Sequence, residues 1–283
     1  MHNFILASFS FNLIKDFQDM LQYSFIQHAF EAGTIIAIVA GLVGYFVVLR
    51  RLSFAAHALS HVGFAGAAGA VLVGINPLIG LMVFTISGAL GMAALGKRAV
   101  NRDVQIGTVL AFMLGLGVLF ISLYKGYATE AYSILFGEIL GISKLDVFIS
   151  LIVGAFLILA MYLIFKPLLF TTLDEDVAEA KGVPVLGINI LFLIIIAIAT
   201  SIAVQVVGVL LIFALLVTPA AIAERLSRNP VSGVLISIIV AVLVTWFGIF
   251  ISFYLPYPVS FFITSLVFFI YLVVRIIPIL KNR

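Results

Sequence analysis

Nine stretches of this sequence are apolar over about 20 residues each, the length that an α-helix needs to cross the hydrocarbon core of a membrane. Turn residues or charges separate them. Hydrophobic residues make up 64% of the chain and charged residues only 10%, far fewer charges than a soluble domain carries, so no soluble core would hold them. We therefore predict an all-α polytopic membrane protein with spans at about 28–49, 54–73, 77–96, 104–124, 146–166, 184–202, 205–223, 231–254 and 258–279.

One further apolar piece, residues 130–143, is too short to cross comfortably. Cytoplasmic loops carry the excess of Lys and Arg, so charge decides its topology. If this piece does not cross and the N-terminus lies outside, twelve of the 15 Lys and Arg residues are cytoplasmic; if it crosses, only six are. The charges favour a re-entrant or short interfacial helix, with the N-terminus outside and the C-terminus cytoplasmic.

The chain divides into an N-terminal segment and one transmembrane domain. Residues 1–27 are aromatic-rich but interrupted by charge, which predicts an amphipathic segment at the lipid interface rather than a signal peptide. Residues 28–283 contain no soluble domain, so the chain would draw energy from an ion gradient or a separate subunit, or act as a channel. Basic residues lie between the spans rather than in one patch, which argues against a nucleic-acid partner. The absence of cysteine excludes thiolate chemistry.

The longest cytoplasmic loop, residues 167–183 in this topology, contains a well-delimited helix within TTLDEDVAEAKGVP. Thr172 and Glu175 have the spacing of a capping box, Gly182 suits the C-terminal cap, and Pro184 prevents continuation. We predict a short helix at about residues 173–181. It is either a solvated connector or a docking element for a cytoplasmic partner, and the sharp caps favour a rigid element.

Two histidines lie one helical turn apart in the second predicted span. His57 and His61 share one face of a helix whose other residues are mostly small, so neighbouring backbones can approach it closely inside the bundle. A lone buried histidine is commonly a hydrogen-bonded structural residue, whereas ionisable groups within a membrane usually mark a path for ions or protons. Neutral imidazoles suit zinc, copper, nickel and iron.

Two imidazoles do not fill a tetrahedral zinc shell, so further ligands must come from elsewhere. The candidates are Glu138 in the short apolar piece, the second subunit of a dimer, and water. His28 and Glu31, at i and i+3 near the outer end of the first span, are a second candidate for meeting a cation. An interfacial anchor explains that pair as well.

Three segments resemble the permeases of bacterial ABC importers of zinc, manganese and iron. FVVLRRLSFAAHALSHVGFAG (46–66) resembles the region of that family in which a basic pair precedes a helix with Asp-x-x-x-Ser-His or a close variant. VVGVLLIFALLVTPAAIAERL (206–226) is similar to its Val-Gly-x-Leu-Leu…Pro-Ala-x-x-Ala segment, and DEDVAEAKGVPV (174–185) to its cytoplasmic coupling element. The segments stand in the family's order, and the similarity extends over about residues 28–280.

This resemblance implies the non-enzymatic permease of an ATP-driven importer in the bacterial cytoplasmic (inner) membrane. It implies a homodimer, a cytoplasmic ATP-binding subunit, an extracytoplasmic metal-binding protein, and a divalent metal as substrate rather than as a resident cofactor. His61 matches the family's histidine in the metal path. Position 57 usually carries Asp, and the imidazole here favours zinc over manganese or iron. The coupling helix at about 173–181 would offer the ATPase Asp174, Glu175, Val177, Ala178, Ala180 and Gly182.

Two alternative functions use the same residues. A secondary transporter would let His57 and His61 carry protons in exchange for a cation, although that class often shows inverted repeats and none is evident here. A zinc protease would need His-Glu-x-x-His, and residues 57–61 lack the glutamate base. Pro219, in the middle of the seventh span, removes a backbone hydrogen bond and predicts a kink that serves as a gate or as static packing.

Overall fold

The structure is a computed structural model that describes residues 13–94, 102–124, 137 and 139–281. Within these ranges the chain forms helices joined by short turns, and nine of them are long and apolar enough to cross a membrane. The long helices are α2 (Ser24–Leu49), α3 (Ser53–Leu72), α4 (Pro77–Ala94), α5 (Arg102–Leu123), α7 (Lys144–Leu173), α9 (Val185–Val207), α10 (Val209–Leu226), α11 (Pro230–Tyr254) and α12 (Val259–Lys281). The short ones are α1 (Leu13–Met20), the 3-10 helix η1 (Ile139–Gly141) and α8 (Glu175–Ala180).

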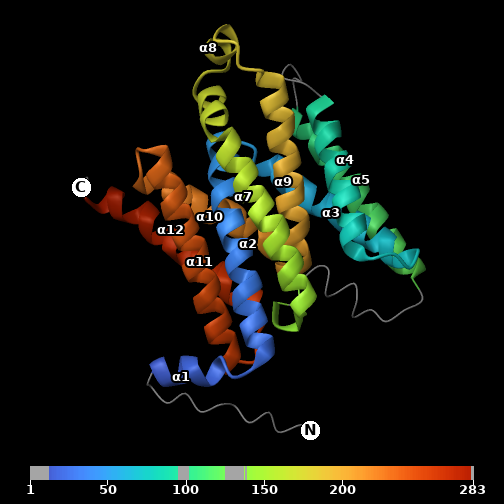
Figure 1. Ribbon diagram of the computed structural model, residues 1–283, viewed down its shortest axis with the longest axis vertical. Helices are drawn as coiled ribbons and strands as arrows, with labels where there is room; N and C mark the ends of the chain where they lie inside the picture. Colours follow the sequence, from blue (N-terminus) through green and yellow to red (C-terminus); the bar gives the residue numbers. More distant parts are fainter. Residues whose placement is uncertain (1–12, 95–101, 125–136, 138, 282–283) are drawn as a thin grey trace.

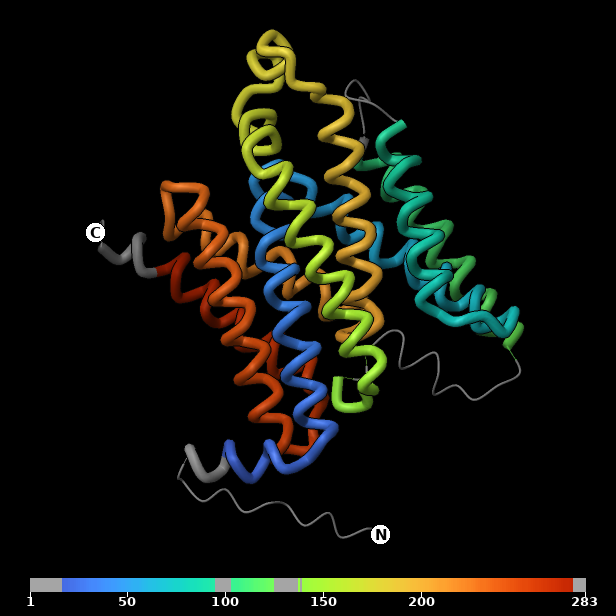
Figure 2. The backbone as a smooth tube through the Cα atoms, in the orientation of Figure 1, coloured from blue at the N-terminus to red at the C-terminus, as the bar shows by residue number. Residues whose placement is uncertain are grey.

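The long helices form three groups (Figures 1 and 2). Helices α2, α7 and α9 lie in the middle, α3, α4 and α5 on one side, and α10, α11 and α12 on the other. Helix α1 lies across one end of the bundle, here called the α1 end, and α8 projects from the opposite end, here called the α8 end (Figure 1). Helix α3 packs on α4, α5, α9 and α10, so it contacts all three groups.

The nine predicted spans are confirmed with shifts of a few residues at their ends, but the predicted end of the fifth span is wrong. The prediction ends this span at residue 166, yet α7 continues to Leu173 through Pro167, which lacks a backbone N–H. Leu168 and Thr171 are buried, and the hydroxyls of Thr171 and Thr172 donate to the Leu168 carbonyl. Packing and these side-chain bonds hold the last turn despite the missing backbone bond.

The apolar piece at 130–143 forms no spanning helix in its described part, residues 137 and 139–143. Helix η1 packs on α2, and Gly137 lies directly against the Val207–Gly208 junction of α9 and α10. Figure 1 shows α5 ending and α7 beginning toward the α1 end. This is the arrangement expected if the intervening chain returns to the side from which it came.

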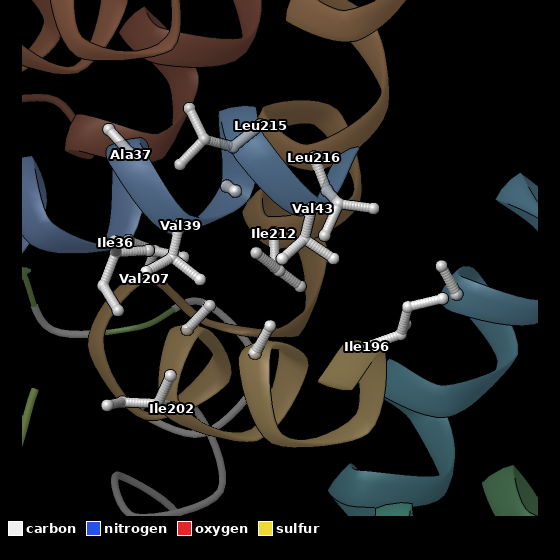
Figure 3. Close-up of a cluster of buried hydrophobic side chains, with 14 of the residues drawn as sticks. Ile36, Ala37, Val39, Val43, Ile196, Ile202, Val207, Ile212, Leu215 and Leu216 are labelled. Carbon is white, nitrogen blue, oxygen red and sulfur yellow. The ribbon is translucent and has the colours of Figure 1, made fainter. Parts of the chain in front are cut away.

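Branched aliphatic side chains from α2, α9 and α10 fill the space between these helices. Figure 3 shows Ile36, Val39 and Val43 of α2 near Ile202 and Val207 of α9 and near Ile212, Leu215 and Leu216 of α10. All of these side chains are buried.

Helices α3 and α4 approach each other without an intervening side chain. A Cβ atom on Gly66 would collide with the carbonyl oxygen of Gly80, and a Cβ atom on Gly80 would collide with the carbonyl oxygen of Gly66. Backbone atoms meet here, so no rotamer change would relieve the clash, and both positions require glycine.

We expect Gly80→Ala to lower the thermal unfolding temperature of the detergent-solubilised protein, since overpacking costs about 1–3 kcal/mol. Gly91→Ala is the matched control on the same helix, because a Cβ atom there has no neighbour within 4 Å. It should leave the unfolding temperature unchanged or slightly higher, since alanine is the better helix former. Equal unfolding temperatures for the two variants would contradict the close approach of α3 and α4.

Candidate functional site

A tight turn joins α2 to α3 and fixes where α3 begins. The N–H groups of Arg51 and Leu52 donate to the carbonyls of Val48 and Val47 at 3.0 and 2.8 Å, which closes the C-terminus of α2. Arg51 has φ 57°, a left-handed conformation that costs a non-glycine residue about 1–2 kcal/mol. Helix α3 starts at Ser53, so the turn holds its first residues close to the end of α2.

His57 and His61 share one face of α3, as their spacing predicts. Their ring centroids lie 4.6 Å apart with the ring planes at 88°. Both side chains are partly buried, and each Nδ1 atom is buried without a hydrogen-bond partner in the part of the chain that the structure describes. With the proton on Nε2, each Nδ1 atom has a lone pair to donate to a cation. The pair can therefore act as a two-nitrogen cation site.

Helix α10 supplies a neighbour that sequence reasoning missed. The ring of Phe213 lies 4.6 Å from that of His57, centroid to centroid, at an interplanar angle of 60°. The hydroxyl of Ser60 is buried and donates to the His57 carbonyl at 2.7 Å, so it is not poised as a nucleophile. A lone phenylalanine in an apolar span carries no signal that would have placed it beside the histidines.

The other predicted metal residues are not brought to this pair. His28 and Glu31 lie near the start of α2 at the α1 end, about 33 and 28 Å along the helix from Arg50 at a rise of 1.5 Å per residue. Glu138 lies outside the described residues. Within the described ranges, no group of three or more His, Cys, Asp or Glu side chains is placed to hold a metal ion. The described part of one chain thus offers a cation two imidazole ligands at this site.

The short helix predicted at about residues 173–181 exists as α8, but its predicted N-cap is wrong. Asp174 is the N-cap, with extended backbone at φ −156° and ψ 109°, and its carboxylate accepts from the Val177 N–H at 3.0 Å. Thr172 still belongs to α7, and its hydroxyl donates to the Leu168 carbonyl within that helix. The expectation for Gly182 is confirmed: its φ is +80°, and the Val183 N–H donates to the Ala178 carbonyl at 3.0 Å.

Helix α8 has one anchored face and one exposed face. Ala178 is fully buried, whereas Leu173 at the end of α7 and Val177 are 72% and 45% exposed, and Ala180 is exposed as well. Glu175 faces inward and forms an ion pair with Arg50, the C-cap residue of α2. The chain thus presents a short apolar strip at the α8 end.

Pro219 is buried inside α10, which continues to Leu226. Its role as a gate stays a prediction.

Comparisons with known proteins agree on one family. The ABC 3 transport family matches residues 22–277. The manganese transport system membrane protein MntC of Halalkalibacterium halodurans is 32% identical over 219 residues, which cover 77% of this chain and 75% of that protein. The manganese import system permease protein ScaB of Streptococcus parasanguinis is 34% identical over 262 residues, covering 91% and 93%. The structure of PsaBC from Streptococcus pneumoniae in complex with Fab has a TM-score of 0.84 and 30% identity, covering 93% of this chain and 95% of that one.

We expect Asp174→Ala to loosen α8, because an alanine at the N-cap costs about 1 kcal/mol, or about fivefold in the local opening equilibrium. Amide hydrogen exchange over residues 175–180 should be faster by that factor, whereas Asp174→Asn, which keeps a capping acceptor, should exchange like the wild type. Thr172→Val should leave exchange in α8 unchanged. The opposite ranking of Asp174→Ala and Thr172→Val would restore the capping box predicted from the sequence.

Proposed function

This chain belongs to the ABC 3 transport family and is a multi-pass inner-membrane permease of a metal ABC importer, and we propose that its substrate is a divalent transition metal that passes the His57–His61 pair. The observation that carries the proposal is the pair itself: two neighbouring, nearly perpendicular imidazoles on a buried helix, each with an unpartnered buried Nδ1 atom among the described residues. Buried polar atoms without partners are rare, and a passing cation would give both of them one.

Manganese and zinc are the two candidate substrates. Manganese is favoured by kinship, since relatives at 32–34% identity are named for manganese transport or import. Zinc is favoured by the donor set, because imidazole nitrogen suits zinc better than manganese, which prefers oxygen. Zinc binds most nitrogen sites more tightly than manganese, so tightness at the pair does not by itself identify the metal that is delivered. His57 is the residue on which the choice depends.

We further propose that the permease is a homodimer. Two imidazoles from one chain leave a metal shell incomplete, and a second copy would add two more. Four neutral ligands would hold a dication without fixing it permanently, as transport requires. Water is the alternative source of the missing ligands.

On the same proposal, α8 faces the cytoplasm and docks on the ATP-binding subunit, and an extracytoplasmic metal-binding protein delivers the metal at the α1 end. The exposed apolar strip of α8 and its sharp caps support a rigid contact. Basic residues support this orientation, since Arg50, Arg51 and Lys181 lie at the α8 end. ATP-driven closure of the ATPase would move α8 and switch the access of the α3 helices.

We expect ATP-dependent metal uptake into vesicles that contain this chain with its ATPase and binding protein. His61→Ala should reduce uptake at least about tenfold, as loss of a metal-site group does. His57→Asp should raise the ratio of manganese to zinc uptake, because a carboxylate oxygen replaces an imidazole nitrogen. Ser122→Ala on α5, an exposed hydroxyl bonded within its own helix, is the control and should transport like the wild type.

Uptake driven by a proton gradient without ATP would contradict the ABC mechanism and favour the secondary transporter. Full uptake in His61→Ala would leave the family in place and remove the histidine pair from the path.

A further inference from the structure

Arg50 links three elements at the α8 end. Its Nη2 atom lies 3.5 Å from Oε1 of Glu175 on α8 and donates to Oδ1 of Asn189 on α9. Its guanidinium carbon lies 5.7 Å from the ring centroid of Phe192, also on α9. The Asn189 side-chain amide donates to the same Glu175 oxygen at 3.3 Å, which closes a triangle of contacts. The Arg50 side chain is 9% exposed and that of Glu175 is 36% exposed.

The chemistry of this cluster requires arginine. A planar guanidinium can contact a carboxylate, an amide oxygen and an aromatic ring at once, whereas a lysine ammonium is a flexible point charge. The cation is largely removed from solvent, so losing its carboxylate partner would leave a buried charge poorly compensated. The Arg50 end of the ion pair is buried and the Glu175 end is partly exposed, so solvent screens the pair only in part.

The backbone of Arg50 is held as firmly as its side chain. The Arg50 N–H donates to the Phe46 carbonyl at 2.9 Å, and the next two N–H groups close the left-handed turn into α3. His57 lies about one turn beyond Ser53, the first residue of α3. The turn that carries the Arg50 side chain is thus also the turn from which the histidine-bearing helix starts.

Helix α8 has two connections to α3: along the chain through α9, which packs on α3, and through the Arg50 contact. Its covalent neighbours are α7 before it and α9 after it. Ala178 anchors α8 by packing, but alanine has no direction-dependent contact to carry a movement. The Arg50–Glu175 ion pair is directional, and it joins α8 to the turn between α2 and α3.

We propose that Arg50 is a positioning residue that couples movement of α8 to the orientation of α3, through its contacts with Glu175 and Asn189. This inference rests on the proposed function, in which α8 docks on the ATPase and α3 carries the metal path. Arg50 touches neither ATP nor the metal. Its effect is on how much metal moves for each ATP hydrolysed.

The test uses the complete complex of permease, ATPase and binding protein in vesicles, with manganese and zinc as the metals and with uptake and ATP hydrolysis measured in the same preparation. Arg50→Gln and Glu175→Gln should lower uptake per ATP hydrolysed by about tenfold, within the range reported for residues along coupling networks. Arg51→Gln is the matched control, since it removes the neighbouring charge from an exposed side chain, and it should keep the wild-type ratio.

Two further measurements separate coupling from folding. Co-purification of the ATPase with each permease variant reports assembly, and the thermal unfolding temperature reports stability. The double variant Arg50→Glu/Glu175→Arg restores the charge pair but not the contacts with Asn189 and Phe192, so it should recover only part of the uptake per ATP. Arg50→Lys keeps the charge without the planar fork and should also recover only part.

If metal uptake and ATP hydrolysis fall together, so that uptake per ATP stays constant, the inference is overturned and Arg50 only stabilises the structure. A wild-type ratio in Arg50→Gln would overturn it too. If the wild-type permease fails to co-purify with the ATPase, or transports neither metal with ATP, the proposed function itself fails. That outcome is distinguishable, since it appears before any variant is compared.

Discussion

The hydrocarbon core of a membrane offers no water to backbone N–H and C=O groups, and the rest of this structure depends on that constraint. Each span must satisfy its own backbone, so the described chain is helical wherever it crosses. Departures from helix are confined to places where other groups complete the hydrogen bonds. The left-handed turn at Arg51 and the cap at Gly182 are such places, and both lie next to residues to which we assign a function.

Small residues then decide which helices can lie inside the bundle. Lipid tails are as apolar as leucine side chains, so helices associate through close packing rather than through the hydrophobic effect. The glycine contact lets the backbones of α3 and α4 meet, and α3 lies mostly buried within the bundle. The small residues of α3, which form no distinctive sequence pattern, are therefore the ones that allow a helix with two histidines to lie inside the bundle.

Much of this could be predicted from the sequence because the signals are local. Span length and charge placement predict the nine long helices, and the i, i+4 spacing predicts that His57 and His61 share a face. The errors arose where tertiary packing overrides a local rule, as at Pro167, where buried side chains hold the helix beyond the proline. Asp174 replaced the predicted cap because the preceding helix is longer than expected.

The contacts that join distant segments had no local signal. Arg50 and Glu175 are 125 residues apart in the sequence. Asn189 lies near the start of a predicted span, where a polar residue is equally well explained by contact with solvent. The neighbour of His57 on α10, Phe213, is one of 26 phenylalanines, so its type did not single it out. Such residues become visible only when the fold brings them together.

An imidazole at position 57, where the resemblance leads us to expect a carboxylate, would change the balance between capture and release of the metal. Neutral ligands leave the charge of a dication uncompensated in a low-dielectric environment, so the site holds it less tightly than a site with a carboxylate. A nearby arginine would make this worse, since it would repel the metal from the α8 end. The pairing of Arg50 with Glu175 offsets that positive charge close to the start of α3.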